Sequence, residues 1–314
     1  LREGIPPQAI LLEKYRSMKS KSAYFNNIAI GIFAKLGGRP WVIGKAISDL
    51  LGKSAYYVGF DVSRMEYEGQ HASAACIVAY DGEGTYVKHK PIEIAVVKEH
   101  LNEKNAEKLM TILVKDYIDT LKEKGLVKER TEFFIVFMRD GVFSNGEVSG
   151  FRNALERMNN EIREKDQPFI IRLFLLEFKK MGGIPLFEKE EVGENIRYDL
   201  AKEGTYVMFR TLESPENKFA LYIQTLGRDS GLRLVRSVKV SPRYYDYENK
   251  EYGWPENKAD DLALAIYRLS RLNWSSFRGR CKLPVPVHYA HKMAYFMENG
   301  IAPKTIEETK LYFL

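Results

Sequence analysis

The apolar run from Glu132 to Met138 (EFFIVFM) constrains the fold of this chain more than any other segment. A strand with one solvated face alternates apolar and polar residues, whereas a strand that is apolar throughout is covered on both faces. The run stops at the polar turn Arg139-Asp140-Gly141, and a helical pattern follows over residues 150–165. The sequence therefore predicts a buried central strand in a sheet that has helices on both sides.

The segments before this run predict strands followed by a helix. The strands cover residues 55–62, 72–80 and 85–90, and the Asp-Gly-rich stretch 81–84 between the last two predicts a hairpin. Apolar residues then recur at helical spacing over residues 102–124, on one face formed by Leu109, Ile112, Leu113, Tyr117 and Leu121.

This order of elements describes an α/β fold with a mixed sheet, and it is also the order of the ribonuclease H fold. Beyond these elements the sequence predicts strands at 168–178, 205–212, 218–226 and 232–240, and helices at 257–274 and 287–298. Before them it predicts helices at 9–18 and 24–36, then a short strand or turn and a further helix at 41–51. The polar and aromatic residues 244–254 predict a surface loop.

The charge of the chain is compatible with a polyanionic partner. Its 48 Lys and Arg against 42 Asp and Glu give a net charge of +6. Such mild basicity permits nucleic acid binding without requiring it, and a robust surface rich in both signs of charge is the alternative interpretation. With 45% hydrophobic residues, the composition is that of an ordinary globular protein.

Cysteine usage and hydropathy predict a cytoplasmic protein without a membrane anchor. Cys76 and Cys281 match no metal or redox spacing, which suits a reducing compartment. No apolar run approaches the roughly 20 residues that span a bilayer, and no secretory signal opens the chain. Because the first residue is a leucine, we expect a fragment or a processed product.

Two aspartates lie where predicted strands end. Asp61 closes the first apolar strand and Asp140 closes the central one. Neighbouring strands run about 4.8 Å apart, so the two carboxylates can share Mg²⁺ or Mn²⁺, which prefer oxygen ligands. Two such ions, about 4 Å apart, can activate a water and stabilise the departing 3′-oxygen of a phosphodiester. A turn or a helix cap is the commoner role of such an aspartate, and both interpretations stay open.

Four motifs, in order along nearly the whole chain, resemble those of the PIWI domain of Argonaute proteins. Gly59 to Ser63 (GFDVS) resembles the G-x-D-V that opens this domain, and Arg139 to Val142 (RDGV) resembles its second motif. Lys35 to Gly38 (KLGG) is similar to the motif that precedes the domain, and Pro284 to His291 (PVPVHYAH) is similar to the P-x-P-x-x-Y-A-H near the family's C terminus.

The resemblance implies a catalytic set of two Asp, one Glu and one His or Asp. Asp61 and Asp140 match the first and third members, and His291 matches the last because it closes the Y-A-H motif. His288, one helical turn away, is the alternative. The implied cofactor is a pair of Mg²⁺ or Mn²⁺ ions, with Asp61, Asp140 and His291 as their ligands.

The remaining member is a glutamate from the segment between the first strands and the central strand. Glu107, near the start of the predicted helix, matches the place of this glutamate in the family, and Glu103 is its alternative. Acids also favour the first turn of any helix because they stabilise its dipole, so a structural role for Glu107 stays open.

The resemblance implies a ribonuclease H-like mixed β-sheet flanked by helices and preceded by a partial MID segment. Residues 1–50 would be the C-terminal part of MID, and residues 51–314 would be the PIWI nuclease domain. The N-terminal, PAZ and upstream MID segments of the same protein would then be missing partners.

The start of the chain and its end resemble the pocket that holds the 5′-phosphate of a guide strand. Gln8 and Lys35 are similar to the pocket glutamine and lysine, and Leu314 would supply the C-terminal carboxylate that holds a cation beside the phosphate. Gly31 stands where another pocket ligand can lie, which is a departure from the family. Candidate contacts to backbone phosphates are Arg268 and Arg271.

The activity that the resemblance implies is guided hydrolysis of a phosphodiester in a target strand, leaving a 3′-hydroxyl and a 5′-phosphate. One alternative is a module that binds guide and target strands without cutting. The other is a different ribonuclease H-like enzyme, such as a resolvase or transposase. The choice between DNA and RNA depends on contacts to the 2′-hydroxyl, which no short motif encodes.

Overall fold

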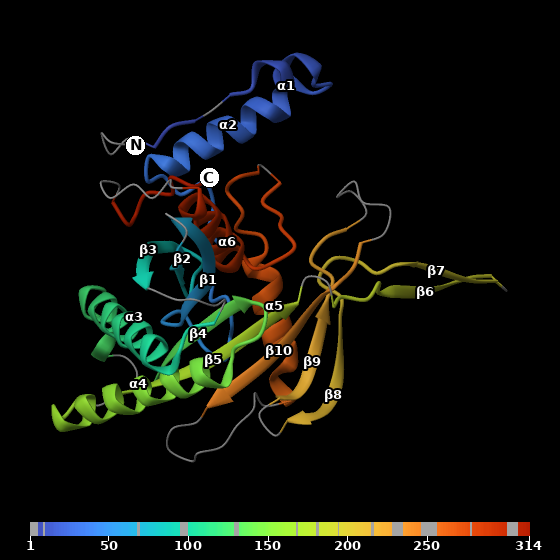
Figure 1. Ribbon diagram of the computed structural model, residues 1–314. Coiled ribbons are helices and arrows are strands. Elements are labelled where there is room, and N and C mark those ends of the chain that lie inside the picture. The colour runs from blue at the N-terminus through green and yellow to red at the C-terminus, as the bar shows by residue number, and fades with distance from the viewer. Residues whose placement is uncertain are drawn as a thin grey trace.

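A computed structural model describes residues 6–8, 10–67, 70–94, 100–128, 132–167, 169–179, 182–193, 195–214, 217–227, 235–245, 256–276, 278–299 and 307–314. Its main sheet has eight strands in the order β3-β2-β1-β4-β5-β10-β9-β8. These strands are β1 (Tyr56–Tyr67), β2 (Gln70–Asp81), β3 (Tyr86–Ile94), β4 (Glu132–Asp140), β5 (Ile170–Lys179), β8 (Tyr206–Ser214), β9 (Asn217–Ile223) and β10 (Val238–Tyr245). A separate hairpin, β6 (Phe187–Val192) and β7 (Asn195–Leu200), projects from the body (Figure 1).

The described helices are α1 (Leu12–Ser17), α2 (Lys21–Lys35), α3 (Glu103–Glu123), α4 (Asn145–Glu164), α5 (Ala259–Leu269) and α6 (Val285–Glu298). Short 3-10 turns lie at Leu126–Lys128 and Glu256–Lys258. Strand β1 is antiparallel to β2 and parallel to β4, which is parallel to β5 in turn. The prediction of a mixed sheet flanked by helices is therefore confirmed.

Different helices cover the two faces of the sheet, α3 and α4 on one side and α5 and α6 on the other (Figure 1). Strand β4 alternates between the two cores: Phe133, Ile135 and Phe137 pack with α3 and α4, while Val136 and Met138 pack with α5 and α6. The central strand is thus buried on both faces, as its apolar sequence predicts.

Helix α2 touches this body only through its C-terminal end. Its buried residues are Gly31, Ala34 and Lys35, whereas Phe25 and Phe33 are each 52% exposed. The helix therefore brings Lys35 to the body and points the rest of its length away from it (Figure 1).

The helix predicted within residues 41–51 is wrong, because the described backbone there forms turns and bends. The polar groups of this segment bond to the body of the protein. The Ile47 amide donates to the Gly82 carbonyl, and the Arg268 guanidinium donates to the carbonyls of Ala46 and Ile47. Tertiary hydrogen bonds therefore replace the helical ones.

Helix α4 begins at Asn145, earlier than the predicted 150, because Ser144 and Glu147 form a capping box. Ser144 accepts from the amide of Glu147, whose side chain accepts from the amide of Ser144. This reciprocal pair satisfies donors that the first helical turn leaves open. In the predicted loop 244–254, Tyr244 and Tyr245 end β10, and residues 246–254 lie outside the described residues.

Gly59 is the point of closest approach between β1 and α6. A Cβ atom at this position would lie 2.0 Å from the carbonyl carbon of Pro286 and 2.4 Å from the Val287 nitrogen. Because backbone cannot move aside as a flexible side chain can, we expect Gly59→Ala to lower the free energy of unfolding by about 1–3 kcal/mol or more. Urea denaturation measures the change.

Gly146→Ala is the matched control for this substitution. It lies in the first turn of α4, and the nearest atom to a new Cβ would be the Glu103 nitrogen at an ordinary 3.6 Å. We expect little change or a small gain in stability from the better helix former. Equal stabilities of the two variants would contradict the close β1–α6 packing.

Candidate functional site

The first candidate site joins Asp61, in the middle of β1, to α6, the helix that carries the Y-A-H motif. The Asp61 Oδ2 lies 2.9 Å from the Nδ1 of His291, and Asp61 Oδ1 accepts the amide of Val62. The Asp61 side chain is 18% exposed and that of His291 57%. The close approach at Gly59 allows this contact, because it brings the backbone of α6 against β1.

Cys76, on the neighbouring strand β2, forms a hydrogen bond with the same helix, α6. It is the β2 partner of Asp61, and its thiol donates to the carbonyl of Ala290 at 3.0 Å. Burial raises the pKa of this thiol well above its ordinary value, so the group stays protonated and can keep donating. His291, which follows Ala290, is therefore anchored from two strands.

Asp140 ends the strand beside β1. The parallel pairing of β1 and β4 runs up to Phe60 and Arg139, the residues just before Asp61 and Asp140. Asp61 and Asp140 therefore directly follow the last paired residues of these two strands. The prediction that Asp61 ends its strand is wrong, because β1 continues to Tyr67 in pairing with β2, whereas Asp140 is the last residue of β4. Among the residues that the structure describes, no three metal-ligating side chains lie close enough to form one cluster.

Buried carboxylates hold the turn that follows Asp140. Glu177 on β5 accepts from the Phe143 amide at 3.0 Å, and Glu147 accepts from the Ser144 amide at 2.7 Å. Burial raises the pKa of Glu177, and the charge of nearby Arg243 opposes that shift. Neither carboxylate figures among the sequence-predicted site residues, although Ser144 to Glu147 carries the S-x-x-E signature of a capping box.

The two candidate glutamates on α3 face helix α4. Glu107 Oε1 lies 2.6 Å from Nη1 of Arg157 in an ion pair, and Glu103 Oε1 accepts from the side-chain amide of Asn153 at 2.9 Å. The structure therefore brings Asp61 and His291 into contact and places Glu107 and Glu103 between the helices instead. The alternative histidine, His288, is half-buried and lies against the ring of Tyr289.

The second candidate site lies at the end of α2. The Lys35 ammonium donates to the Pro7 carbonyl at 2.7 Å and to Gln8 Oε1 at 2.9 Å, so the two residues predicted for one pocket are in contact. Burial and, to a smaller extent, the charge of Lys292 together lower the pKa of Lys35 to about 8. Gln8 Oε1 lies 3.5 Å from where a side chain at Gly31 would begin.

Lys292 adds a cation that the sequence does not single out. It follows His291 on α6, and its ammonium lies over the Tyr289 ring at 5.8 Å. Burial lowers the pKa of Lys292. Two partly desolvated ammonium groups close enough to repel each other would be stabilised by an anion between them.

The C-terminal residues tuck into the core beside this site. Leu311, Tyr312 and Phe313 are buried, and Leu314 packs against the same core cluster. A cavity of about 210 Å³ separates this tail from the end of α2, with Gly37, Gly38 and Arg39 on one side and Thr309, Lys310 and Leu311 on the other. The inward course of the apolar tail is confirmed, while a contact of the Leu314 carboxylate with Lys35 stays a prediction.

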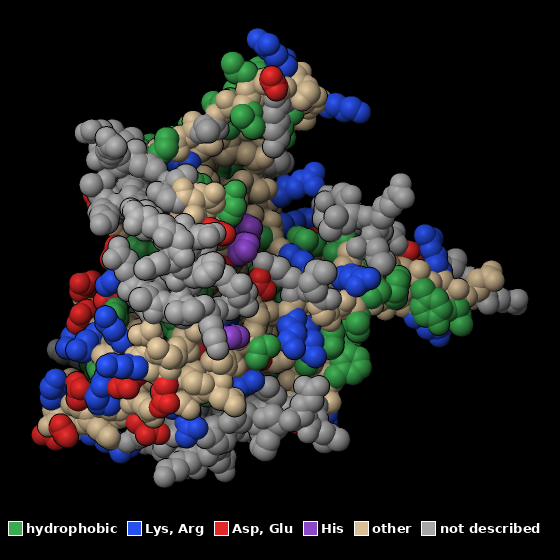
Figure 2. All heavy atoms as spheres, viewed as in Figure 1, with side chains coloured by type: hydrophobic (Ala, Val, Ile, Leu, Met, Phe, Trp, Pro, Cys, Tyr) green, Lys and Arg blue, Asp and Glu red, His purple; other side chains and the backbone are tan. Residues whose placement is uncertain are grey.

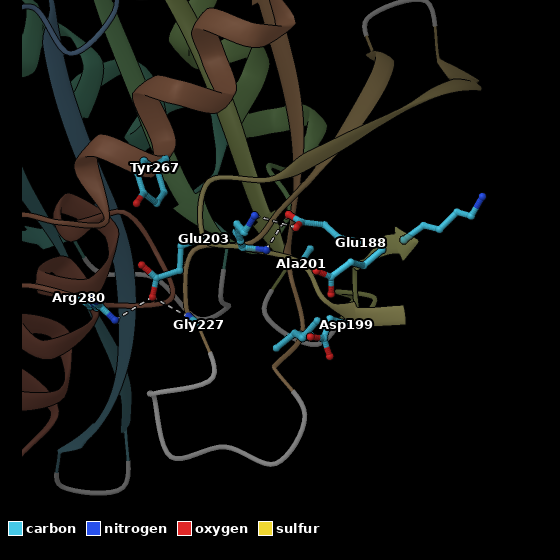
Figure 3. Close-up of a pocket in the computed structure, with 11 residues that line it drawn as sticks. Glu188, Asp199, Ala201, Glu203, Gly227, Tyr267 and Arg280 are labelled. Carbon is cyan, nitrogen blue, oxygen red and sulfur yellow. Dashed lines mark hydrogen bonds and ion pairs between the residues drawn. The ribbon is translucent and has the colours of Figure 1, made fainter. Parts of the chain in front are cut away.

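The predicted phosphate contacts Arg268 and Arg271 are engaged within the protein. Arg268 donates to the carbonyls of residues 46 and 47, and Arg271 pairs with Glu203 and lies over the Tyr267 ring. Glu203 also pairs with Arg280 beside a cavity of about 860 Å³ at the base of the β6–β7 hairpin (Figure 3). A phosphate would have to compete with these internal partners.

Charged side chains are distributed unevenly over the face seen in Figure 2. Acidic and basic groups are interspersed over α3 and α4, whereas Lys and Arg predominate between α2 and the projecting hairpin. Within the described residues, no helix is both long and apolar enough to cross a membrane.

Comparison with known proteins agrees with the motifs. The family model described as the Piwi domain matches residues 1–302. The chain is 26% identical to an Argonaute protein of Aquifex aeolicus, over 100% of this chain and 37% of that protein. It is 24% identical to an Argonaute protein of Pyrococcus furiosus, over 92% of this chain and 32% of that one.

Solved structures show the same fold. The crystal structure of A. aeolicus Argonaute has a TM-score of 0.59 at 23% identity, over 100% of this chain and 38% of that chain. The C-terminal lobe of a budding yeast Argonaute has a TM-score of 0.63 at 18% identity, over 97% of this chain and 63% of that chain. The Argonaute of Methanocaldococcus jannaschii in complex with guide DNA has a TM-score of 0.56 at 18% identity, over 98% of this chain and 36% of that chain.

The mixed sheet with helices on both faces defines a ribonuclease H-like α/β domain. Because the match covers residues 1–302 of 314, the chain belongs to the Piwi domain family. It spans only 32–37% of the length of the Argonaute relatives from A. aeolicus and P. furiosus.

Proposed function

We propose that this protein is a guide-directed endonuclease, which hydrolyses a phosphodiester of a target strand paired to a 5′-phosphorylated guide. The 2.9 Å contact between Asp61 and His291 carries the proposal, because it joins two sequence motifs that lie far apart in the chain. The end of β4, where Asp140 lies, is next to the same strand. The structurally similar M. jannaschii Argonaute was solved with guide DNA, which supports a nucleic-acid guide.

The cofactor in this proposal is a pair of Mg²⁺ or Mn²⁺ ions. Carboxylate oxygens, such as those of Asp61 and Asp140 on adjacent strands, are the donors that such ions prefer, and an imidazole nitrogen is acceptable to Mn²⁺. Asp61, Asp140 and His291 would hold the ions. When bound, the ions would activate a water and offset the negative charge that develops on the phosphate.

His291 and the glutamate on α3 would complete the catalytic set. The imidazole of His291 is 57% exposed, so a ring nitrogen can orient a water or exchange a proton with it. Glu107 would have to separate from its partner Arg157 to reach the carboxylate of Asp61, and Glu103 is its alternative. Arg157 is 49% exposed, so solvent screening keeps the cost of that separation small.

The end of α2 would anchor the 5′-phosphate of the guide. Lys35 and Lys292 would supply positive charge, Gln8 a hydrogen bond, and the tail at Leu314 a carboxylate for a bridging cation. In this proposal residues 1–50 are the end of a MID domain and residues 51–314 the PIWI domain. Further segments, such as those of the longer relatives, would complete the nucleic-acid channel. We also propose that the protein is cytoplasmic, which suits its two free cysteines.

A module that binds guide and target without cutting is the second candidate. The ion pair between Glu107 and Arg157 favours it, because a glutamate held there cannot act at the Asp61 edge. The two candidates differ only in cleavage, since both require the phosphate anchor at Lys35.

Incubation with 5′-phosphorylated DNA and RNA guides and labelled targets, in all four pairings with Mg²⁺ or Mn²⁺, tests the proposal. We expect at least one pairing to yield products with a 3′-hydroxyl and a 5′-phosphate. Binding without cleavage in every pairing would support the second candidate. Cleavage that needs no guide would indicate a different ribonuclease H-like enzyme.

A further inference from the structure

Glu147 on α4 is a fully buried carboxylate that accepts from several parts of the chain at once. Its Oε1 lies 2.6 Å from Nη1 of Arg139 and 3.0 Å from the Leu101 amide. Its Oε2 lies 2.7 Å from the Ser144 amide and 3.2 Å from Nδ1 of His100. A capping box needs only the contact with Ser144, so the others serve a further purpose.

This arrangement requires a carboxylate in particular. Two carboxylate oxygens offer about four acceptor positions, which match the donors from Arg139, Leu101, Ser144 and His100. A glutamine has the same shape, but its single oxygen cannot replace both acceptors, and its NH₂ group would face donors. A buried N–H group left without an acceptor is costly, so Glu147→Gln should loosen the contacts rather than rearrange them.

The donors come from the two segments that the proposed reaction must bring together. Arg139 precedes Asp140, and Ser144 closes the turn that follows it. His100 and Leu101 lead into α3, the helix of the candidate glutamates. The helices also interlock, since a Cβ at Gly150 of α4 would lie 2.2 Å from the Glu103 carbonyl.

We propose that Glu147 is a positioning residue that locks the turn after Asp140 to the segment leading into α3. Glu147 touches neither substrate nor metal; it acts through Arg139 and through the backbone on each side. Arg139 is 6% exposed and its guanidinium lies 5.5 Å over the Phe60 ring, so the same lock also reaches the residue before Asp61. This role rests on the proposed metal-dependent cleavage.

The test compares Glu147→Gln with Ser144→Ala, which removes the other half of the capping box and leaves the contacts of Glu147 with Arg139, Leu101 and His100. Both variants weaken the cap of α4, so both should lose thermal stability. Only Glu147→Gln should raise the Mn²⁺ concentration that half-saturates the free protein, by about tenfold, as loss of a residue that orients metal ligands does. Calorimetric Mn²⁺ titration measures this.

Hydrogen exchange gives a readout that does not depend on metal or activity. In Glu147→Gln the amides of residues 100–102 and 141–144 should lose protection together, whereas in Ser144→Ala only the first turn of α4 should. If Glu147→Gln does not fold, His100→Ala removes one donor from outside α4 without exposing a buried charge. It should raise exchange at residues 100–102 and shift the Mn²⁺ titration in the same direction.

The outcomes separate this inference from the proposed function. If wild-type protein binds no Mn²⁺, the nuclease proposal fails, and exchange alone decides whether Glu147 couples the two segments. If the Glu147→Gln and Ser144→Ala proteins match each other in both readouts, Glu147 is only a helix cap and the inference is wrong.

Discussion

Replacing Asp61 with alanine should reduce target cleavage by at least roughly a thousandfold, the scale typical of removing a central catalytic group. The substitution takes away the carboxylate that contacts His291 and would hold a metal ion. Guide affinity should change little, because Asp61 and the anchor at Lys35 lie on different elements, β1 and α2. Single-turnover cleavage with a preassembled guide measures the first effect, and filter binding measures the second.

Asp199→Ala is a suitable control for this result. Asp199 lies on the β6–β7 hairpin and pairs with Arg197 at 3.7 Å, so its loss removes one carboxylate without touching the β1–β4 edge. Cleavage should stay near the wild-type rate. Undiminished cleavage by the Asp61→Ala protein would contradict any role of this carboxylate in the reaction.

The second large effect is expected at the other end of the protein. Lys35→Ala should weaken binding of a 5′-phosphorylated guide by roughly tenfold or more, since a hydrogen bond to a charged group contributes about 1.5–3 kcal/mol. Lys292→Ala should add to the loss, because its ammonium shares the site. A guide with a 5′-hydroxyl should bind both variants and the wild type with similar, weaker affinity. Fluorescence anisotropy at two salt concentrations measures these affinities, and the slope against log salt should be shallow because few phosphates are contacted.

Lys189→Ala provides the matched loss of one positive charge, since Lys189 pairs with Glu191 on the distant hairpin.

With a pKa of about 8, Lys35 in the free protein is a cation below that pH and loses its charge above it. Guide affinity should therefore fall as pH rises from 7 to 9 in wild type, and the fall should be smaller in Lys35→Ala. If Asp61→Ala abolished guide binding while Lys35→Ala had no effect, the two ends would be assigned wrongly.

The sequence predicts the parts of the site that depend on strand order and motif spacing. Apolar runs predict the adjacent strands β1 and β4, which carry Asp61 and Asp140, and the Y-A-H motif identifies His291. The apolar run ends near Asp61, so it does not predict that β1 continues to Tyr67. The pairing of Gln8 with Lys35 likewise follows from motif resemblance. These inferences need no knowledge of side-chain conformation.

Features that depend on tertiary packing escape the sequence. Glu147 looks like an ordinary capping residue until the structure brings His100, Leu101 and Arg139 onto it. Lys292 resembles any surface lysine, since neither its burial nor its proximity to Lys35 is visible in the sequence. Glu107 is a further example. The sequence predicts a catalytic role for it, but its ion pair with Arg157 depends on how α3 and α4 pack.

The β6–β7 hairpin is missed for a different reason. Strand β6 reads FEKEEV, and β7 is exposed along most of its length, so neither shows the apolar alternation that marks a half-buried strand. At the base of the hairpin Glu188 accepts from the Lys202 amide and the Thr205 hydroxyl, and the pattern of apolar residues does not reveal these contacts.

Mapping the cut site with a series of guides tests guided cleavage most directly. Each 5′-phosphorylated guide is shifted by one nucleotide along the same labelled target. We expect the cut to move by one nucleotide with each shift, to require Mg²⁺ or Mn²⁺, and to disappear in the Asp61→Ala protein. A cut that stays at one position whatever the guide, or no cut while guide and target are both bound, would contradict the account.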